Sequence, residues 1–254
     1  MFMGRRVLGV VTARGGSKGV PRKNLARIGG HTLTGWALNC LVATPEVDRA
    51  LVSSEDEEIR AHVNRFGPYA PFVRPAELAT DEARSLPVLV HALKWAEAND
   101  QVTYDFVVLA EPTSPFRLPE LFRRGLEVAV RTDASSVSSV EDVGHHHPIR
   151  VKRLTPEGFL EPWCEEETEG MRRQEQPPAW IRNGAMYVFP RKTLLANRLW
   201  GDRPAGVPVD AQACVNIDTP ADLYLARYMW EEAVAMGTTC TLLPDWTLGP
   251  DPET

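Results

Sequence analysis

Two patterns of hydrophobic and polar positions alternate along the first 140 residues of the chain. Short, mainly apolar runs predict strands at residues 7–11, 49–53, 71–74, 106–109 and 136–140. Between these runs, apolar residues at helical spacing predict helices at residues 33–42, 54–66, 82–99 and 119–131. Strands that alternate with helices in this way predict an α/β fold, in which helices cover both faces of a mostly parallel sheet.

Residues at the predicted helix starts support these assignments. Thr32 and Thr34 are candidate N-caps for the first helix, because a hydroxyl can accept a hydrogen bond from a free backbone N–H there. Acidic residues open the second helix after Ser54, where they complement the helix dipole. Pro119 lies in the first turn of its helix, where a missing N–H is tolerated.

The pattern changes near residue 144. Residues 145–176 are irregular and polar, and their acidic run at 165–169 is typical of a solvated loop. Core-like strands return at 185–189 and 213–217, followed by a helix from Pro220. We predict an α/β domain at residues 1–143 and 180–243, a small extension at 144–179 and a loosely held tail at 244–254.

Composition narrows the class of protein. The net charge of −6 argues against a general nucleic-acid binder, which needs a basic surface. No stretch approaches the ~20 apolar residues of a membrane span. The four cysteines are scattered and form no Cys-x-x-Cys pair, which favours thiols in a reducing compartment. We therefore expect a cytoplasmic protein without a membrane partner.

The segment at residues 12–24, here called the cationic loop, carries the strongest chemical signal. It follows the first predicted strand, and its glycines allow backbone N–H groups to approach an anion. Its four cations are Arg14, Lys18, Arg22 and Lys23, and no acidic residue precedes Glu46. Because lysine and arginine are typical phosphate ligands, the loop predicts a site for the phosphates of a nucleotide triphosphate.

Two better-known phosphate motifs are excluded for this loop. It contains neither the Walker A spacing nor the Gly-x-Gly-x-x-Gly fingerprint of dinucleotide-binding folds. Most glycine-rich turns after a strand are only turns. Four cations within ten residues repel one another, however, and a plain turn would not favour them.

Three further strand ends carry polar residues, and ligands of open α/β sheets bind at such ends. They are residues 79–85 after Arg74, residues 111–117 and residues 216–219. Asp218 has two interpretations: an N-cap for the following helix, or a carboxylate ligand of Mg²⁺ beside phosphates. For the three adjacent histidines at 145–147 we favour a loop or a partner contact over a metal cluster, since alternate side chains face opposite ways.

The cationic loop contains ARGGSKGVPRKN, which resembles the opening signature of the acylneuraminate cytidylyltransferases, that is, CMP-sialic acid synthetases. Further blocks follow in the family's order: RPAELATD at 74–81, PTSP at 112–115, RQ at 173–174, IRNGA at 181–185 and IDT at 217–219. The resemblance covers residues 7–226.

This resemblance implies a Rossmann-like, three-layer nucleotidyltransferase fold whose small extension exchanges across a homodimer. The family transfers CMP from CTP to the anomeric hydroxyl of a nonulosonic acid, with Mg²⁺, and releases pyrophosphate. It implies nucleotide-binding roles for Ala13, Arg14, Gly15, Ser17, Lys18, Lys23, Asn24, Arg74, Ala79 and Ser85. It implies acceptor-binding roles for Glu111, Thr113, Ser114, Lys152, Arg173 and Tyr187, with Lys152 and Arg173 reaching into the partner's site. For catalysis we expect Asp218 to anchor Mg²⁺, with Asn216 as a second ligand, and Arg14 and Lys18 to stabilise the pyrophosphate.

Two residues depart from the family pattern. Glu111 stands before the PTSP block where the family often has Gln, and a carboxylate repels an acidic acceptor. Asn216 stands where an Asp-x-Asp pair is frequent, so the metal site has one negative charge fewer. Two alternatives follow. In the first, the enzyme uses another acceptor in place of sialic acid: a legionaminic, pseudaminic or deaminated sugar acid, or an acceptor with an amino group. In the second, the protein is a nucleotide-binding homologue without turnover.

Overall fold

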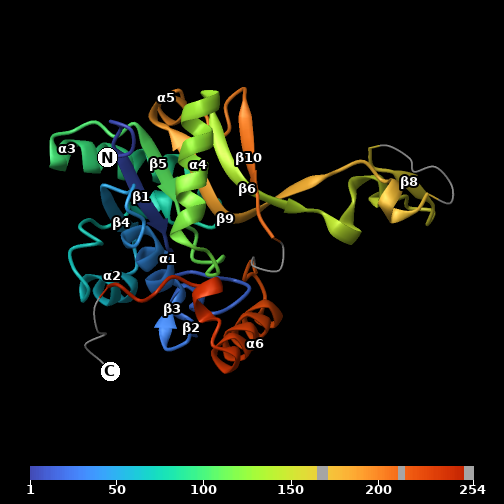
Figure 1. The fold of residues 1–254 in the computed structure, drawn as a ribbon, viewed down its shortest axis with the longest axis horizontal. Coiled ribbons are helices and arrows are strands. Elements are labelled where there is room, and N and C mark those ends of the chain that lie inside the picture. The colour runs from blue at the N-terminus through green and yellow to red at the C-terminus, as the bar shows by residue number, and fades with distance from the viewer. Residues whose placement is uncertain (165–170, 211–214, 249–254) are drawn as a thin grey trace.

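The computed structural model of the protein describes residues 1–164, 171–210 and 215–248, and for Arg173 it describes the backbone alone. A six-stranded sheet forms the centre of the molecule, with the strand order β10-β6-β9-β5-β1-β4 (Figure 1). The strands are β1 (Val7–Thr12), β4 (Arg49–Ser53), β5 (Phe106–Leu109), β6 (Ser136–Asp142), β9 (Trp180–Pro190) and β10 (Pro204–Pro208). The helices are α1 (Leu33–Val42), α2 (Glu57–Asn64), α3 (Ser85–Asp100), α4 (Pro119–Thr132), α5 (Arg191–Leu195) and α6 (Pro220–Met236).

The sheet is mostly parallel, as the sequence predicts. Strand β1 pairs in parallel with β4 and β5, and β10 pairs in parallel with β6. Among the six strands, β9 alone runs antiparallel to its neighbours, β5 and β6. Two further pairs lie outside this sheet, β2 (Arg27–Ile28) with β3 (His31–Thr32) and β7 (Lys152–Leu154) with β8 (Leu160–Pro162).

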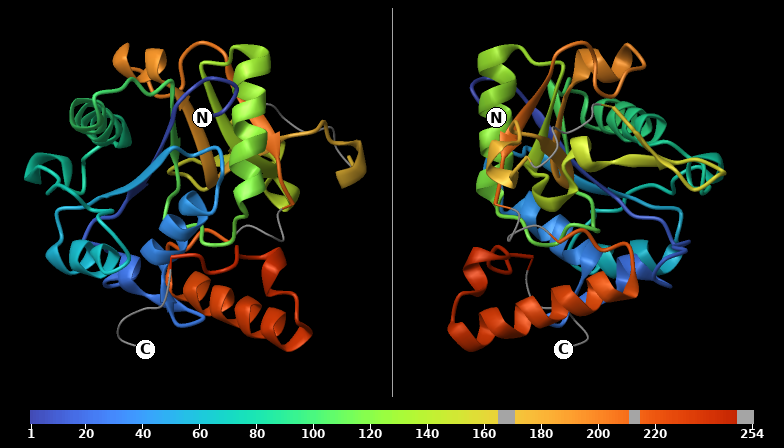
Figure 2. Two further views of the ribbon diagram at one scale, coloured as in Figure 1. Left: turned by 60° about the vertical axis from the view of Figure 1, so that its left-hand side comes forward. Right: turned by 90° about the vertical axis from the view of Figure 1, so that its right-hand side faces the viewer.

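Helices cover both faces of the sheet, which confirms the predicted three-layer α/β fold. Side chains alternate along β1: Val7 and Val11 pack on the face covered by α1, α2 and α4, and Leu8 and Val10 pack on the face covered by α3 and α5. Figure 2 shows α3 and α4 on opposite sides of the sheet. The continuous apolar runs of β1 and β5 follow from burial on both faces.

A third apolar cluster fixes α6 beside α1. Trp36 of α1 packs there with Ile217, just before α6, and with Ala226 of α6. This packing carries residues 216–219 to the carboxyl end of β1, because α6 starts immediately after them. Within the described ranges, no helix has both the length and the apolar character that a membrane span requires.

Two of the predicted strands are not present as predicted. Residues 71–74 form no strand, because Pro71 has no N–H with which to extend a ladder beside β4. Val215, Asn216 and Ile217 are also irregular, and the rest of the predicted strand, Ala213 and Cys214, lies outside the described residues.

The sheet edge beside β6 is formed by β10 instead, a strand that the sequence does not predict. Pro204 and Pro208 stand at its two ends, and prolines argue against a strand from sequence alone. They are tolerated because β10 pairs on one side only. Helix α5 and the β2–β3 pair are likewise absent from the sequence prediction. Other boundaries shift: α3 begins at Ser85 rather than at residue 82, and β9 begins five residues before residue 185, at Trp180.

Residues 244–248 are packed rather than loose. Trp246 stacks on His31, with 3.6 Å between the ring centroids, and Leu248 is buried against α1 and its surroundings. The Asn39 side chain donates to the Asp245 carbonyl at 2.9 Å and accepts from the Thr247 N–H at 2.7 Å. The predicted loose tail is therefore wrong for these five residues, while residues 249–254 lie outside the described ranges.

The extension at residues 144–179 projects away from the sheet, along the line of β6 and β9 (Figure 1). It contains the β7–β8 pair and several short 3-10 turns. Four large apolar side chains on it are between 59% and 73% exposed: Leu154, Phe159, Leu160 and Trp163. The acidic run at 165–169, predicted as a solvated loop, lies outside the described residues. Within the described part, an extension this apolar on its outside resembles an interface rather than a free surface.

Candidate active site

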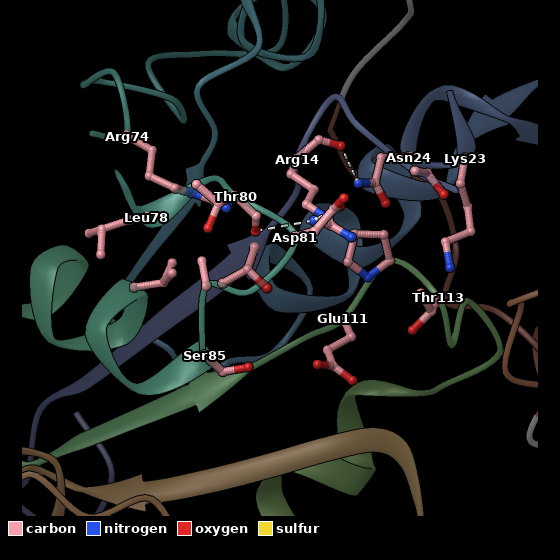
Figure 3. Close-up of a pocket in the computed structure, with 15 residues that line it drawn as sticks. Arg14, Lys23, Asn24, Arg74, Leu78, Thr80, Asp81, Ser85, Glu111 and Thr113 are labelled. Carbon is pink, nitrogen blue, oxygen red and sulfur yellow. Dashed lines mark hydrogen bonds and ion pairs between the residues drawn. The ribbon is translucent and has the colours of Figure 1, made fainter. Parts of the chain in front are cut away.

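A cavity of about 280 Å³ opens at the carboxyl ends of β1 and β5 (Figure 3). Three segments that lie far apart in the sequence form its walls: the cationic loop, residues 74–88 and the turn after β5. The lining residues are Thr12, Arg14, Ser17, Lys23, Asn24, Arg74, Leu78, Thr80, Asp81, Ala83, Ser85, Val88, Glu111, Pro112 and Thr113. The fold thus brings together three of the four strand ends that the sequence singles out, and the fourth borders them through Asp218.

Two glycines of the cationic loop are required by close approach. A Cβ on Gly15 would lie 2.2 Å from the Asp56 carboxylate, and a Cβ on Gly19 would lie 2.0 Å from the main-chain oxygen of Asp218. The loop is closed by Asn24, whose side chain donates to the Arg14 carbonyl at 2.8 Å. Backbone in such close contact has no room for side chains, so the glycines hold the loop against two neighbouring segments.

One carboxylate contacts two of the cations of the loop. Asp81 Oδ1 lies 2.6 Å from Arg14 Nη1, and Asp81 Oδ2 lies 2.7 Å from Lys18 Nζ. The Lys18 ammonium, together with the Arg14 guanidinium, holds the pKa of Asp81 below its ordinary value. Asp81 is therefore ionised at neutral pH.

The other two cations of the loop also have acidic partners. Arg22 lies 2.6 Å from Asp56 and 2.5 Å from Glu58, and Lys23 Nζ lies 2.9 Å from Asp218 Oδ1. The sequence predicts a concentration of positive charge here, since no acidic residue is close along the chain. The fold corrects this expectation, because it brings a carboxylate from another segment to every one of the four cations.

Asp218 is not the N-cap of α6. Thr219 caps the helix and forms a capping box with Asp222, so the structural interpretation of Asp218 is wrong. Asp218 is 63% exposed, and its Oδ2 accepts from the Asn216 amide at 2.7 Å. The Asn216 oxygen accepts from the Ser114 hydroxyl at 3.3 Å, which ties this segment to the turn after β5. Asn216 therefore presents a donor to Asp218, where the sequence predicts an oxygen for a metal ion.

Arg74 is a buried cation that joins the ends of two strands. Only 5% of it is exposed, and it donates to the hydroxyl and the carbonyl of Ser53 and to the Ala13 carbonyl. Burial lowers the pKa of Arg74, and the Glu55 carboxylate opposes this shift from 4.0 Å. Glu55 also accepts from the Gly15 N–H at 2.7 Å. Arg74 thus lines the cavity and braces the base of the cationic loop at once.

Glu111 lies at the end of the cavity that faces β9. Burial raises the pKa of its carboxyl above the ordinary value; Arg117 opposes this shift, and Asp218 adds to it to a smaller extent. Burial and the Glu111 carboxylate together raise the pKa of Tyr187, on β9, to about 12. The charge of Asp218 therefore acts on the pKa of Glu111, and the charge of Glu111 acts on the pKa of Tyr187, although the three residues come from three segments of the chain.

Several residues with predicted roles lie outside the cavity lining. Lys18, Ser114, Asn216 and Asp218 border it through the contacts given above, and the buried Ala13 and the half-buried Gly15 form the base of the loop. Ala79 does not line the cavity, but Ala83, four residues further on, does. Lys152 lies in β7 and Arg173 begins a 3-10 turn, both on the projecting extension, and the side chain of Arg173 is outside what the structure describes.

The site contains residues that the sequence reasoning missed. Asp81 ends the RPAELATD block, and Glu55 belongs to the acidic start of the second predicted helix, so both lie in segments with a sequence signal. Neither carries a sign of its partner, because Arg14 lies 67 positions from Asp81 and the Gly15 N–H lies 40 positions from Glu55. Leu78, Ala83 and Val88 add an apolar wall to the cavity that no motif marked.

Comparisons with known proteins agree with this geometry. The family model described as cytidylyltransferase matches residues 8–148, more than half of the chain. The CMP-N,N'-diacetyllegionaminic acid synthase of Legionella pneumophila is 28% identical over 242 residues, covering 89% of this chain and 97% of that protein. An N-acylneuraminate cytidylyltransferase of Oncorhynchus mykiss is 28% identical over 88% of this chain, which spans half of that longer protein.

A solved structure shares the fold. The CMP:2-keto-3-deoxy-manno-octonic acid synthetase complexed with CTP superposes with a TM-score of 0.66 at 18% identity, over 89% of this chain and 99% of that one. This likeness supports the nucleotidyltransferase architecture. Together with the matching family model, it confirms the resemblance read from the motifs: the chain belongs to the cytidylyltransferase family, and is a nucleotidyltransferase.

Proposed function

We propose that the protein transfers CMP from CTP to the anomeric hydroxyl of a nonulosonic, sialic-acid-like sugar acid and releases pyrophosphate. One observation carries the proposal: a single cavity joins the cationic loop to Ser85 and Glu111 at neighbouring strand ends. The relatives named above act, by their names, on legionaminic and on N-acylneuraminic acid, which supports an acceptor of this class.

The two halves of the cavity take the two substrates. Arg14, Ser17 and Lys23 line the half formed by the cationic loop and bind phosphate oxygens there. The apolar wall with Leu78 and Val88 takes the base. The half beyond Glu111, toward Tyr187, takes the sugar acid.

The chemistry is an in-line displacement at the α-phosphorus of CTP. The anomeric oxygen forms a bond to this phosphorus as the bond to the bridging oxygen of pyrophosphate breaks, and the hydroxyl proton leaves to water. Arg14 and Lys18 stabilise the negative charge on the departing pyrophosphate. Positioning and charge stabilisation supply most of the rate, because phosphoryl transfer needs little covalent help from the protein.

We include Mg²⁺ in this proposal, with Asp218 as the residue that would hold it. Asn216, the expected second ligand, donates to Asp218 and would orient its carboxylate. Magnesium is typically held by one or two carboxylates together with substrate phosphates and water. Asp218 is exposed beside the phosphate half and fits this pattern. No described group of three or more His, Cys, Asp and Glu side chains is arranged as a dedicated metal cage, so the phosphates supply the remaining ligands. When bound, the ion neutralises charge on the phosphate oxygens.

The homodimer is also part of the proposal. Leu154, Phe159 and Leu160 on the extension are mostly exposed, and burial against a second copy would remove this apolar surface from water. Lys152 and Arg173 lie on the same extension and, by the resemblance, reach the acceptor carboxylate in the partner's site. Size-exclusion chromatography with light scattering tests the oligomer directly.

The decisive experiment measures pyrophosphate release from CTP and Mg²⁺ with a panel of acceptors. The panel contains N-acylneuraminic, legionaminic, pseudaminic and deaminated nonulosonic acids. Release with at least one of them, and formation of the matching CMP-sugar, supports the function. CTP binding without release for every acid would instead support a homologue that has lost turnover.

Glu111 favours a second acceptor within the same reaction. A buried carboxylate at the acceptor end accepts hydrogen bonds and attracts an ammonium group, but it repels another carboxylate. An acceptor that presents an amino group or several hydroxyls at this point therefore gains over one that presents an acidic group. Comparing the acceptor panel for wild type and Glu111→Gln separates the two, because the amide removes the charge and keeps the shape.

A further inference from the structure

Asp81 has contacts unlike those of the other carboxylates around the cationic loop. Asp56 is fixed as the N-cap of α2, where it accepts from the Ile59 N–H at 3.0 Å. Asp218 accepts from Asn216 as well as from Lys23. In the contacts described for Asp81, both oxygens bind only the two cations Arg14 and Lys18. Its side chain is 45% exposed, so solvent reaches both ion pairs.

Asp81 binds the same two cations, Arg14 and Lys18, that the proposed function assigns to phosphate. Figure 3 shows the Arg14 side chain reaching to Thr80 and Asp81 inside the cavity. Arg14 also donates to the Thr80 carbonyl at 3.2 Å, so the loop between the turn at Ala76–Leu78 and α3 supplies both acceptors. These are the donors to which the proposed function assigns phosphate oxygens. One carboxylate therefore occupies, in the protein without nucleotide, the donors that the triphosphate needs.

We propose that Asp81 is an internal counterion that the triphosphate displaces, and that it thereby sets the affinity of the site for phosphorylated ligands. The proposal rests on the proposed function, because it takes Arg14 and Lys18 to be phosphate ligands. Asp81 keeps the two cations gathered and neutralised until CTP arrives. It then moves away from the phosphates, together with its exposed loop.

The balance of charge favours replacement of Asp81 by the triphosphate at Arg14 and Lys18. Asp81 offers a single negative charge, whereas a triphosphate offers several and can meet the Arg14 guanidinium with two oxygens at once. Exposed ion pairs are weak, so the pairs of Asp81 are easily replaced. CMP lacks the two leaving phosphates that the proposed function assigns to Arg14 and Lys18, so Asp81 weakens the binding of CTP and pyrophosphate but not that of CMP. The counterion thereby favours release of pyrophosphate after the reaction.

The test is equilibrium binding of CTP, CMP and inorganic pyrophosphate, measured by calorimetry without acceptor. We compare wild type with Asp81→Asn, which removes the charge and keeps the shape. Asp133→Asn is the matched control, because Asp133 forms an exposed pair with Lys192 at 2.6 Å outside this cavity. Asp81→Asn is expected to bind CTP and pyrophosphate about threefold to tenfold more tightly, and the control to bind as wild type does. CMP, which lacks the phosphates assigned to Arg14 and Lys18, is expected to bind Asp81→Asn as it binds wild type.

Steady-state kinetics provide a second, independent measure of the same exchange. In Asp81→Asn the KM for CTP falls and kcat is unchanged or lower, because pyrophosphate leaves more slowly. Unchanged or weaker binding of CTP and pyrophosphate by Asp81→Asn would overturn the counterion role. Failure of the wild type itself to bind CTP would overturn the proposed function instead, so the two failures are distinguishable.

Discussion

The cationic loop and the extension differ in whether their charged or apolar side chains find partners within the same chain. In the loop, all four cations have carboxylate partners from other segments, and Gly15 and Gly19 fit against backbone and side chains at close range. On the extension, Leu154 and Phe159 are more than two thirds exposed. The loop is therefore preassembled by the fold of a single chain, whereas the extension presents an exposed apolar surface, for which we propose a second copy of the chain.

Substitution of Lys18 has the largest expected effect on the loop side of this comparison. Lys18→Ala is expected to lower kcat/KM about 1000-fold, or by about 4 kcal/mol, because its charge bears on the leaving group. Its side chain is 79% exposed, so the melting temperature stays the same. Arg22→Ala is the control from the same loop, since Arg22 pairs with Asp56 and Glu58, which do not line the cavity, and it is expected to lose less than about tenfold. Near-normal CMP transfer by Lys18→Ala would remove it from the chemistry.

On the extension side, a single apolar residue is expected to carry much of the association. Leu160→Ser should weaken the dimer about 30-fold, or by about 2 kcal/mol, because an exposed apolar anchor is lost. Leu195→Ser, on an exposed leucine of α5, is the control and should leave the dimer intact. Light scattering over a dilution series measures both. If the two variants dissociate alike, or neither does, the apolar surface of the extension is not the interface.

Asp218 tests whether the preassembled site still requires a metal ion. Asp218→Asn is expected to raise the Mg²⁺ concentration for half-maximal activity about tenfold, which corresponds to about 1.4 kcal/mol. Binding of CTP without Mg²⁺ should become no weaker, because Lys23 loses its acidic partner and is released for phosphate. A titration of activity with Mg²⁺ gives the first value and calorimetry the second. An unchanged Mg²⁺ dependence would assign the metal to other residues.

Substitution of Glu111 has the smallest expected effect, which is on the free energy of unfolding. Because its pKa is raised, the ionised carboxylate is disfavoured in the folded protein, and the resulting loss of stability develops as the pH rises through its folded-state pKa. Glu111→Gln is expected to be more stable than wild type at pH 7 by about 1 kcal/mol. The two proteins should converge as the pH falls below 4.5, the ordinary pKa, where both states bind the proton. Urea unfolding at a series of pH values measures this difference, and a constant difference at all pH values would exclude a role for ionisation.

The fold is largely readable from the sequence where the pattern is continuous. Strands β1 and β5 are apolar on both faces, and the N-cap Thr32 and the first-turn Pro119 mark the starts of α1 and α4. Strand β10 is hidden because Pro204 and Pro208 are tolerated only by its place at the sheet edge, a property of topology rather than of local sequence.

In the candidate site, too, some features can be predicted from the sequence and others cannot. The cationic loop can be predicted from local composition, because its glycines and cations are close together in the sequence. Asp81, Asp56 and Asp218 are ordinary acidic residues in the sequence, and only the fold shows that each faces a cation of that loop. Charge balance in a site depends on distances in space, so a count along the chain overestimates how positive the loop is.

The reversed strand β9 has a consequence for how the chain folds during synthesis. Strand β9 lies between β5 and β6, so it is the piece that joins β6 and β10 to the rest of the sheet. A nascent chain that ends at residue 179 has β1, β4, β5 and β6, but the slot between β5 and β6 is still empty. The extension must therefore leave the ribosome before the sheet can close, and the edges of β5 and β6 stay open to wrong pairing until then.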